Sequence, residues 1–336
     1  MASKRSRLLS DVLSVLSNYG LSKTETDIIG ELKEEKVWLV QNKKTGKRYV
    51  LKRLNEDKTN FPILLHSKLY ETGFHVPEIF QTKTKQYYVH RKNSYYYLMD
   101  YISLSETRPS FRQRIEGLAR FHADSLFPDW IGSHSPSFPK SKEVLHAHRQ
   151  KVAQLQEMAK AANGTALSHI MKQMAQLANQ SYVLLEKSDL ADFCLEAAER
   201  KAICHGDYNS NNLLLAENDN VMMIDFDRAY YGLPLDDFRF LLISLTKNPK
   251  NDVIKRLEPL FDLYFSICSL YAPYKNVYLA DAMFPHVFYS EMAIVEKRKQ
   301  TAKNRSSLDL LTRLAEQETK KFAFLSDLFK SEGSRT

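Results

Sequence analysis

The sequence changes character near residue 100, and this change limits the folds open to the chain. Before that point, β-branched and aromatic residues gather in short runs such as "KVWLV" and "KRYVLKRL", with polar turn segments such as "QNKKTG" between them. After residue 103, apolar residues recur at helical spacing in segments rich in Ala, Leu, Lys, Gln and Glu. Strand signals and helix signals that are segregated in this way predict an α+β fold.

Two lobes are expected from this pattern. Residues 1–99 predict a small N-terminal antiparallel β-sheet lobe with one helix, and residues 100–336 predict a larger, mainly helical C-terminal lobe. Within the second lobe, residues 201–230 break the helical pattern, because two apolar runs flank polar turn material and read as a short hairpin.

Helix signals also occur before the strand runs of the first lobe and between them. Asn60 is a candidate N-cap for the single helix, and Gly73 with Pro77 would end it. At the N-terminus, the apolar residues between Leu8 and Tyr19 fall at helical spacing, and polar residues interrupt them. That spacing predicts an amphipathic surface helix rather than a secretory signal.

The composition is that of a globular chain, with 43% hydrophobic and 26% charged residues. No apolar run approaches the length of a membrane span, so no membrane association is expected. The cysteines Cys194, Cys204 and Cys268 are odd in number and lack metal-ligand spacing, which favours a reducing cytoplasm. The net charge of +8 comes from scattered Lys and Arg without a nucleic-acid-binding motif, so a solvated basic surface is favoured over a nucleic-acid partner.

One segment is too polar for its surroundings. The stretch "HGDYNSNN", residues 205–212, lies between apolar runs and contains more hydrogen-bonding side chains than a tight turn needs. Asp207 and Asn212 lie five residues apart within it, and Asp225 follows the apolar run "VMMI". Lys52 lies in the strand run "YVLKRL", where alternation places it on the same face as Val50.

These residue types suit phosphoryl transfer, which depends on positioning and on neutralised charge. A strand lysine can hold phosphates as a point charge, and amide and carboxylate oxygens are ligands that Mg²⁺ prefers. A second carboxylate can orient and deprotonate an acceptor hydroxyl. Each residue taken singly also has an ordinary structural interpretation: a solvated edge lysine, an Asn-rich turn, or an aspartate that caps a strand end. Their order along the chain favours the chemical interpretation.

At these residues the chain resembles a known family. "HGDYNSNN" followed by "MIDFD" is similar to the signatures of the aminoglycoside phosphotransferase and choline kinase-like superfamily, whose members share the two-lobed fold of protein kinases. The resemblance extends to "VLKRL", "GFHVPEI", "YLMDYI", "GLARFH" and "GLPLDDFRFLL". Within the superfamily, the last segment and the Tyr-rich helices look most like the CotS-type spore coat kinase-like proteins of endospore formers.

The resemblance implies a nucleotide-binding lobe at residues 1–99 and a catalytic, substrate-binding lobe at residues 100–336, with ATP and Mg²⁺ as cofactors. It implies that Asp207 is the catalytic base, that Asn212 and Asp225 are metal ligands, and that Lys52 binds phosphates. It further implies that the backbone of Asp100, Tyr101 and Ile102 meets adenine. The side chains with a supporting role would be His205, Asp227 and Asp237. Two interpretations of Asp227 stay open, contact with a second metal or attachment of the strand end.

The sequence departs from the family pattern at two points. The segment "IIGELKEEKV", where a phosphate-covering loop is expected, contains only Gly30. The helix glutamate that pairs with the strand lysine in relatives is expected near Pro62, yet no acidic residue lies between Asn60 and Tyr70.

Two functions of different classes follow from the resemblance. The first is an ATP- and Mg²⁺-dependent phosphotransferase that acts on a hydroxyl of a small molecule, because only eleven residues separate Asp225 from Asp237 and leave little room for a peptide platform. The alternative is a catalytically weak or inactive structural protein of the spore coat, with coat proteins as its partners. A nucleic-acid-binding protein is a third and less favoured reading. The Tyr- and Phe-rich run "FDLYFSICSLYAPY" is expected to be core more than a stacking surface.

Overall fold

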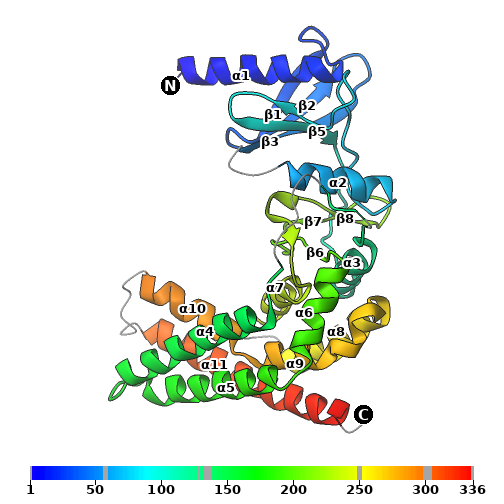
Figure 1. Ribbon diagram of the computed structural model, residues 1–336. Coiled ribbons are helices and arrows are strands. Elements are labelled where there is room, and N and C mark those ends of the chain that lie inside the picture. Colours follow the sequence, from blue (N-terminus) through cyan, green and yellow to red (C-terminus); the bar gives the residue numbers. More distant parts are fainter. Residues whose placement is uncertain are drawn as a thin grey trace. The chain divides into compact units, whose positions relative to one another are not determined.

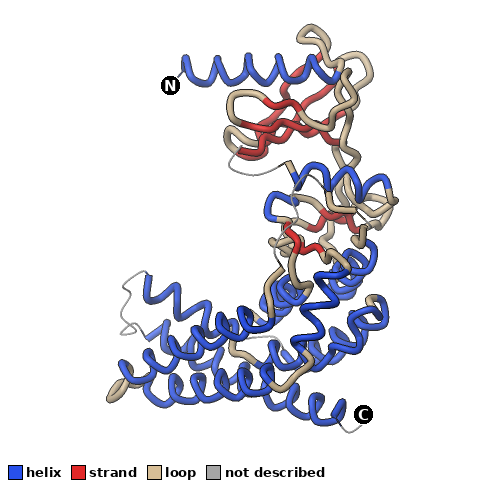
Figure 2. The backbone as a smooth tube through the Cα atoms, viewed as in Figure 1, coloured by secondary structure: helices blue, strands red, loops and turns tan. Residues whose placement is uncertain are grey.

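A computed structural model describes residues 2–55, 60–127, 129–131, 138–247, 252–297 and 305–333. The chain divides into two compact units, whose elements Figures 1 and 2 show. Unit 1 comprises Met1–Arg114, Asp129–Ser135 and His205–Tyr230, and unit 2 comprises Ile115–Pro128, Pro136–Cys204 and Tyr231–Thr336. The division into functional lobes at residues 1–99 and 100–336 stays a prediction.

Unit 1 contains the sheet that the strand runs predict. Its five strands are all antiparallel and follow the order β1-β2-β3-β5-β4. They are β1 (Thr26–Lys33), β2 (Val37–Asn42), β3 (Arg48–Asn55), β4 (Val89–His90) and β5 (Ser94–Asp100). The hairpin between β2 and β3 forms where "QNKKTG" predicts a turn.

The two faces of the sheet are covered by different helices. On one face, Trp38 and Leu51 pack with Val12 and Leu16 of α1 (Ala2–Leu16) into one buried apolar cluster. This confirms the amphipathic N-terminal helix. On the other face, Ile63 of α2 (Phe61–Glu71) packs against side chains that include Leu54 and Tyr97. Because residues alternate between faces along β3, Leu51 faces α1 and Lys52 points to the side that α2 covers.

The bounds of α2 (Phe61–Glu71) agree with the predicted helix. Asn60 occupies the N-cap position, but its side chain makes no capping bond and donates instead to the Tyr88 hydroxyl at 3.0 Å. Asn60 is therefore the N-cap residue that the sequence predicts, although its side chain makes no capping bond. Gly73 follows the helix with a φ of +82°, a left-handed conformation that glycine adopts without strain.

The remaining part of unit 1 carries the polar segment. Strands β7 (Leu213–Leu215) and β8 (Val221–Met223) form the predicted antiparallel hairpin, and a short 3₁₀ turn, η2 (Phe226–Arg228), follows β8. The Met223 N–H donates to the His75 carbonyl at 2.9 Å, which fixes β8 to the segment that follows α2. Two short strands flank this part along the chain: β6 (Ile203–Cys204) belongs to unit 2, and β9 (Tyr230–Tyr231) lies at the boundary between the units.

Unit 2 is helical, and its helix bounds agree with the predicted change of character after residue 103. Helix α3 (Phe111–Asp124) begins at the end of a unit 1 segment and continues into unit 2. The other described helices of unit 2 are α4 (Ser141–Ala161), α5 (Ser168–Glu186), α6 (Leu190–Glu199), α7 (Leu235–Thr246), α8 (Val253–Ile267), the 3₁₀ helix η3 (Ser269–Tyr274), α9 (Lys275–Met283), α10 (His286–Lys297) and α11 (Arg305–Gly333). Unit 1 also has a short 3₁₀ helix, η1 (Ser17–Tyr19). Tyr264 and Tyr271 of the Tyr-rich run are fully buried, which confirms its expected core role.

A buried ion pair joins two helices of unit 2. Glu318 on α11 accepts the N–H groups of Val287 at 2.9 Å and Phe288 at 3.4 Å in the first turn of α10. Lys321, one turn further along α11, donates to the Phe284 carbonyl at 2.9 Å and lies 2.5 Å from the Glu318 carboxylate. Because free N–H groups at a helix start need acceptors, Glu318 caps α10 from outside that helix.

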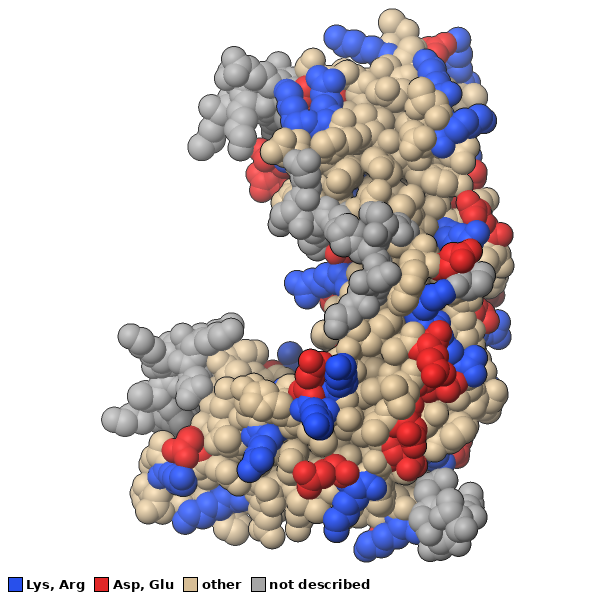
Figure 3. Space-filling model, viewed as in Figure 1, with Lys and Arg blue, Asp and Glu red and all other residues tan. Residues whose placement is uncertain are grey.

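Two surface properties bear on possible partners. None of the described helices is both long and apolar enough to cross a membrane. On the face that Figure 3 shows, Lys and Arg side chains lie interspersed with Asp and Glu side chains.

Candidate active site

The polar segment 205–212 folds into a loop that is held by its own side chains. The Asp207 N–H donates to His205 Nδ1 at 3.3 Å, so Nδ1 is the acceptor and Nε2 carries the proton. His205 Nε2 then donates to the Ile224 carbonyl at 2.9 Å, directly before Asp225. The buried His205 ring therefore connects the loop that carries Asp207 to the strand end that carries Asp225.

Asn209 holds the Asp207 side chain. Its amide nitrogen donates to Asp207 Oδ1 at 2.9 Å and to the Asp207 carbonyl at 3.1 Å. Its oxygen accepts the Asn211 N–H at 2.9 Å, as an Asx turn requires. The sequence predicted only a turn former here. The missed signal was an amide two residues after a candidate base, the spacing at which it can reach that carboxylate.

Asn212 is buried and attached to the same loop. Its Nδ2 donates to the Asp207 carbonyl at 2.9 Å, and its backbone carbonyl accepts the Ile224 N–H at 3.0 Å. Because the amide nitrogen is fixed on one side, the orientation of the Oδ1 acceptor is fixed as well. The loop thus presents the amide oxygen of Asn212 as a hard donor atom.

Backbone geometry restricts both strand-end and loop positions. Asp225 has a left-handed backbone, with φ 65° and ψ 60°, which Asp tolerates better than most residues. Gly206 has a φ of +75°, and a Cβ there would lie 2.1 Å from the Arg228 carbonyl oxygen. Only glycine permits this approach between the loop and η2. Such strained positions cluster at functional sites.

Lys52 extends from β3 into a pair of carboxylates. Its Nζ lies 2.5 Å from Asp225 Oδ1 and 2.7 Å from Asp227 Oδ1, and its side chain is only 7% exposed. The Lys52–Asp225 contact is a hydrogen-bonded ion pair, and the Lys52–Asp227 contact is a close ion pair. The structure therefore brings Lys52, Asp225 and Asp227 together within unit 1.

The surroundings of Lys52 keep it charged. Burial would lower the pKa of its ammonium group, but neighbouring Tyr97, Asp227 and Asp225 together raise that pKa above its ordinary value. Burial also raises the pKa of the Tyr97 hydroxyl, which keeps Tyr97 neutral at neutral pH. The two carboxylates are thus the charges that stabilise the Lys52 ammonium under these conditions.

A second lysine faces the same side of the sheet. Cross-strand pairing aligns Lys33 of β1 with Val37, Val37 with Lys52, and Lys52 with Tyr97, and paired residues project to the same face. Burial raises the pKa of the Asp225 carboxyl, but the charges of Lys52 and then Lys33 lower it, with a net shift below its ordinary value. Lys33 is not predicted from the sequence, because the face on which it lies depends on strand pairing.

The remaining predicted residues lie at two other places. Asp100 ends β5, where Lys47 lies 3.5 Å from its carboxylate, and Arg48 lies over the ring of Tyr101. Tyr101 and Ile102 follow as the chain leaves the sheet. Asp237 belongs to α7 in unit 2, where its buried carboxylate lies 3.3 Å from His122 Nε2. Its predicted contact with the catalytic loop stays a prediction.

The site offers hard oxygen donors but no preformed cage of acidic and imidazole ligands. Among the described residues, no group of three or more His, Cys, Asp or Glu side chains could hold a metal ion. Asn212 and Asp225 fit Mg²⁺ nonetheless, because this ion takes one or two protein ligands and completes its shell with phosphates and water.

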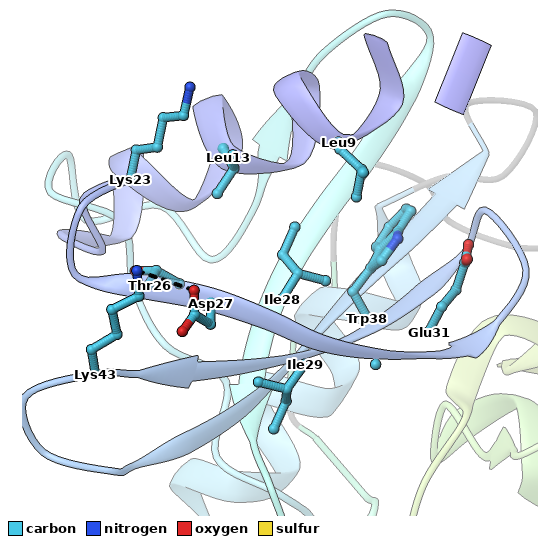
Figure 4. A pocket seen from close by; sticks show the side chains of 11 residues that line it. Leu9, Leu13, Lys23, Thr26, Asp27, Ile28, Ile29, Glu31, Trp38 and Lys43 are labelled. Atoms are coloured by element: carbon cyan, nitrogen blue, oxygen red, sulfur yellow. Dashed lines mark ion pairs between the residues drawn. The ribbon is translucent and has the colours of Figure 1, made fainter. Parts of the chain in front are cut away.

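A separate hollow lies on the opposite face of the sheet. It has a volume of about 470 Å³ and opens between α1 and β1, where Leu9, Leu13, Ile28 and Trp38 line it (Figure 4). Since Trp38 belongs to the face that packs on α1, this hollow lies away from Lys52. None of the predicted site residues lines it.

The site combines a buried lysine on a five-stranded antiparallel sheet, a loop with Asp and Asn, and an Asp that follows a strand. Residues 29–272 match the model of a phosphotransferase enzyme family that includes the aminoglycoside-type enzymes, and the chain belongs to this family. The predicted protein-kinase-like fold and superfamily are thereby confirmed.

Solved structures share this fold at low sequence identity. An aminoglycoside phosphotransferase from Alicyclobacillus acidocaldarius has a TM-score of 0.71 and 21% identity, with 96% of each chain covered. A spectinomycin phosphotransferase in its AMP-bound complex has a TM-score of 0.57 and 12% identity, covering 92% of this chain and 98% of that chain. A choline kinase from Cryptosporidium parvum has a TM-score of 0.50 and 11% identity, covering 93% and 92%.

Proposed function

We propose that the protein transfers the γ-phosphoryl group of ATP to a hydroxyl of a small molecule in a Mg²⁺-dependent reaction. The observation that carries this proposal is the Lys52–Asp225 pair at 2.5 Å, which joins the sheet lysine to the aspartate at the end of β8. Membership of the phosphotransferase family supports the reaction class. The solved relatives named for aminoglycosides, spectinomycin and choline support a small-molecule acceptor.

In this proposal the charges of unit 1 hold the nucleotide. Lys52 binds the α- and β-phosphates, and Asn212 and Asp225 hold Mg²⁺, which neutralises phosphate charge as the reaction proceeds. Lys33 adds a second positive charge on the same face of the sheet. It lies at the β1–β2 hairpin, whose turn lacks the glycines that expose backbone N–H groups to phosphates. The backbone at Asp100, Tyr101 and Ile102 meets the adenine.

Asp207 acts as the general base. Its carboxylate accepts the proton of the acceptor hydroxyl while Asn209 holds it in one orientation through Nδ2. His205 supports the loop through its bonds to Asp207 and Ile224. The family resemblance extends the proposal to Asp237 as a further supporting residue. With eleven residues between Asp225 and Asp237, the chain lacks the length that a peptide platform would need.

The finer resemblance to CotS-type proteins extends the proposal to an association with the spore coat, with coat proteins as partners. The structural alternative, a coat scaffold with little turnover, draws support from α2, which has no acidic residue before Glu71. The enzyme is favoured over the scaffold, because two carboxylates hold Lys52 although α2 supplies none.

An acceptor screen tests the reaction class. The native chain is incubated with Mg·ATP and a panel of amino alcohols, hydroxy amino acids and amino sugars, and ADP formation is measured. We expect acceptor-dependent ADP formation that stops when Mg²⁺ is chelated and in Lys52→Ala, and that persists in Lys43→Ala, a lysine at the exposed β2–β3 turn. No turnover above the Lys52→Ala level, with any acceptor or with water, would contradict the enzyme and favour the scaffold.

A further inference from the structure

In the proposed phosphotransferase, Asp225 has two tasks that compete. It is the shortest contact of Lys52, at 2.5 Å, and it is also a proposed Mg²⁺ ligand. When the carboxylate turns to the dication, less of its charge stabilises the ammonium group. A lysine that is 7% exposed then needs another carboxylate, because a buried unpaired charge is costly.

Helix α2 cannot supply this carboxylate from the position that the family pattern predicts. Its sequence has no Asp or Glu before Glu71, and Glu71 accepts from the Tyr87 hydroxyl at 2.7 Å and pairs with Lys68. His66 lies nearer to the site, with its ring 5.2 Å from that of Phe226, and its Nε2 donates to the Pro77 carbonyl at 2.7 Å. Burial lowers the pKa of His66 to about 3, so this helix brings no charge to Lys52.

Asp227 lies where the missing charge is needed. Its Oδ1 is 2.7 Å from Lys52 Nζ. The turn that carries it is fixed, because the Phe226 ring is buried between the rings of His66 and His205. The ring centroids of Phe226 and His205 are 4.9 Å apart. The Ala229 N–H closes η2 on the Phe226 carbonyl at 2.8 Å. A carboxylate on a fixed turn can hold a lysine as a helix glutamate would.

We propose that Asp227 is the positioning residue for Lys52 and replaces the helix glutamate that α2 lacks. The inference rests on the proposed function, since it assumes that Asp225 binds Mg²⁺ during the reaction. It assigns Asp227 to the lysine and not to a second metal ion. It also accounts for a chain that retains Lys52, Asp207, Asn212 and Asp225 without an acid at the usual helix position.

A labelling experiment without nucleotide tests whether Asp227 holds Lys52. Acylation of lysines by an activated ester is followed by mass spectrometry in the native chain, in Asp225→Asn, which imitates the diversion of Asp225, and in Asp225→Asn/Asp227→Asn. We expect Lys52 to stay protected in Asp225→Asn, because Asp227 still holds its ammonium group in the buried site. In the double variant no carboxylate holds it, and we expect Lys52 to react about tenfold faster or more. Exposed Lys36 serves as internal reference.

A double-mutant cycle with Mg·ATP then separates the lysine role from a metal role. Asp227→Asn is expected to weaken Mg·ATP binding about tenfold or more in the native background and to have no further effect in Lys52→Ala. Asp219→Asn, an exposed aspartate in the β7–β8 turn, is the matched control. The proposal would be overturned if Asp227→Asn weakened Mg·ATP binding as much in Lys52→Ala as in the native background, or if it raised the Mg²⁺ concentration needed for binding in Lys52→Ala. Either result would favour a role of Asp227 as a metal ligand.

The two experiments fail in distinguishable ways. If the native chain binds no Mg·ATP, the proposed function fails, while the labelling rates still decide whether Asp227 holds Lys52. If Mg·ATP binds but Lys52 reacts equally fast in Asp225→Asn and in the double variant, the role of Asp227 is wrong and the proposed function stands. Thermal midpoints of each variant show whether the changes in rate reflect the site or loss of folding.

Discussion

Asp207→Asn is expected to reduce phosphoryl transfer by ~10²–10⁴-fold, the usual contribution of a positioned general base. The amide cannot take the proton of the acceptor hydroxyl. The loop should keep its shape, because His205 and Asn212 bind the backbone of Asp207 and not its side chain. Nucleotide affinity should therefore stay unchanged while turnover falls, as steady-state rates and calorimetric titration of the same preparation would measure.

Asp219→Asn provides the matched control for this substitution. It makes the same chemical change at an exposed aspartate of unit 1, at a left-handed position that Asn tolerates. Its turnover should equal that of the native chain. Full activity in Asp207→Asn would refute the role of Asp207 as base, and a parallel loss of nucleotide binding would show that the substitution acts through the loop's structure.

Lys321→Ala is expected to destabilise unit 2 by ~3–5 kcal/mol, the usual cost of removing one partner of a buried ion pair. Glu318 is 3% exposed and caps the first turn of α10, so the substitution leaves its charge buried without the ammonium. The urea midpoint of the helical circular dichroism signal measures the loss. Lys320→Ala, on the exposed neighbouring position of α11, should shift that midpoint little.

A second variant separates the missing charge from the missing side chain. In Glu318→Gln/Lys321→Met, neither charge remains and the methionine fills the space of the lysine stem, so much of the lost stability should return. Equal midpoints for Lys321→Ala and Lys320→Ala would contradict the account of this pair. So would a double variant that is no more stable than Lys321→Ala.

Local signals in the sequence were sufficient for the fold. The β-branched runs became the strands of one antiparallel sheet, and the helical periodicity after residue 103 became the helices of unit 2. These predictions held because each element buries a face whose spacing is visible in the sequence. Asn60 is the N-cap residue as predicted, but its side chain bonds to the Tyr88 hydroxyl, 28 residues away, and local sequence signals do not show that contact.

The sequence predicts which residues form the candidate site better than it predicts which of them contact one another. The order of Lys52, Asp207, Asn212 and Asp225 along the chain predicts their roles. The sequence pattern places a carboxylate partner of Lys52 on α2, whereas the structure has its partners at Asp225 and, on η2, Asp227. Asp227 follows Asp225 so closely that its role depends on the 3₁₀ turn, which the sequence did not indicate. Asn209 was missed because a turn former and an orienting amide have the same residue type.

The central claim is that Lys52, Asn212 and Asp225 hold Mg·ATP, and a thermal-shift titration with ATP, with and without Mg²⁺, tests it most directly. At ~100-fold over its dissociation constant, a ligand adds roughly 2.7 kcal/mol to stability. We predict such stabilisation in the native chain with Mg²⁺, and loss of its Mg²⁺ dependence in Asp225→Ala. No shift at millimolar Mg·ATP, or an equal metal-dependent shift in Asp225→Ala, would contradict the claim.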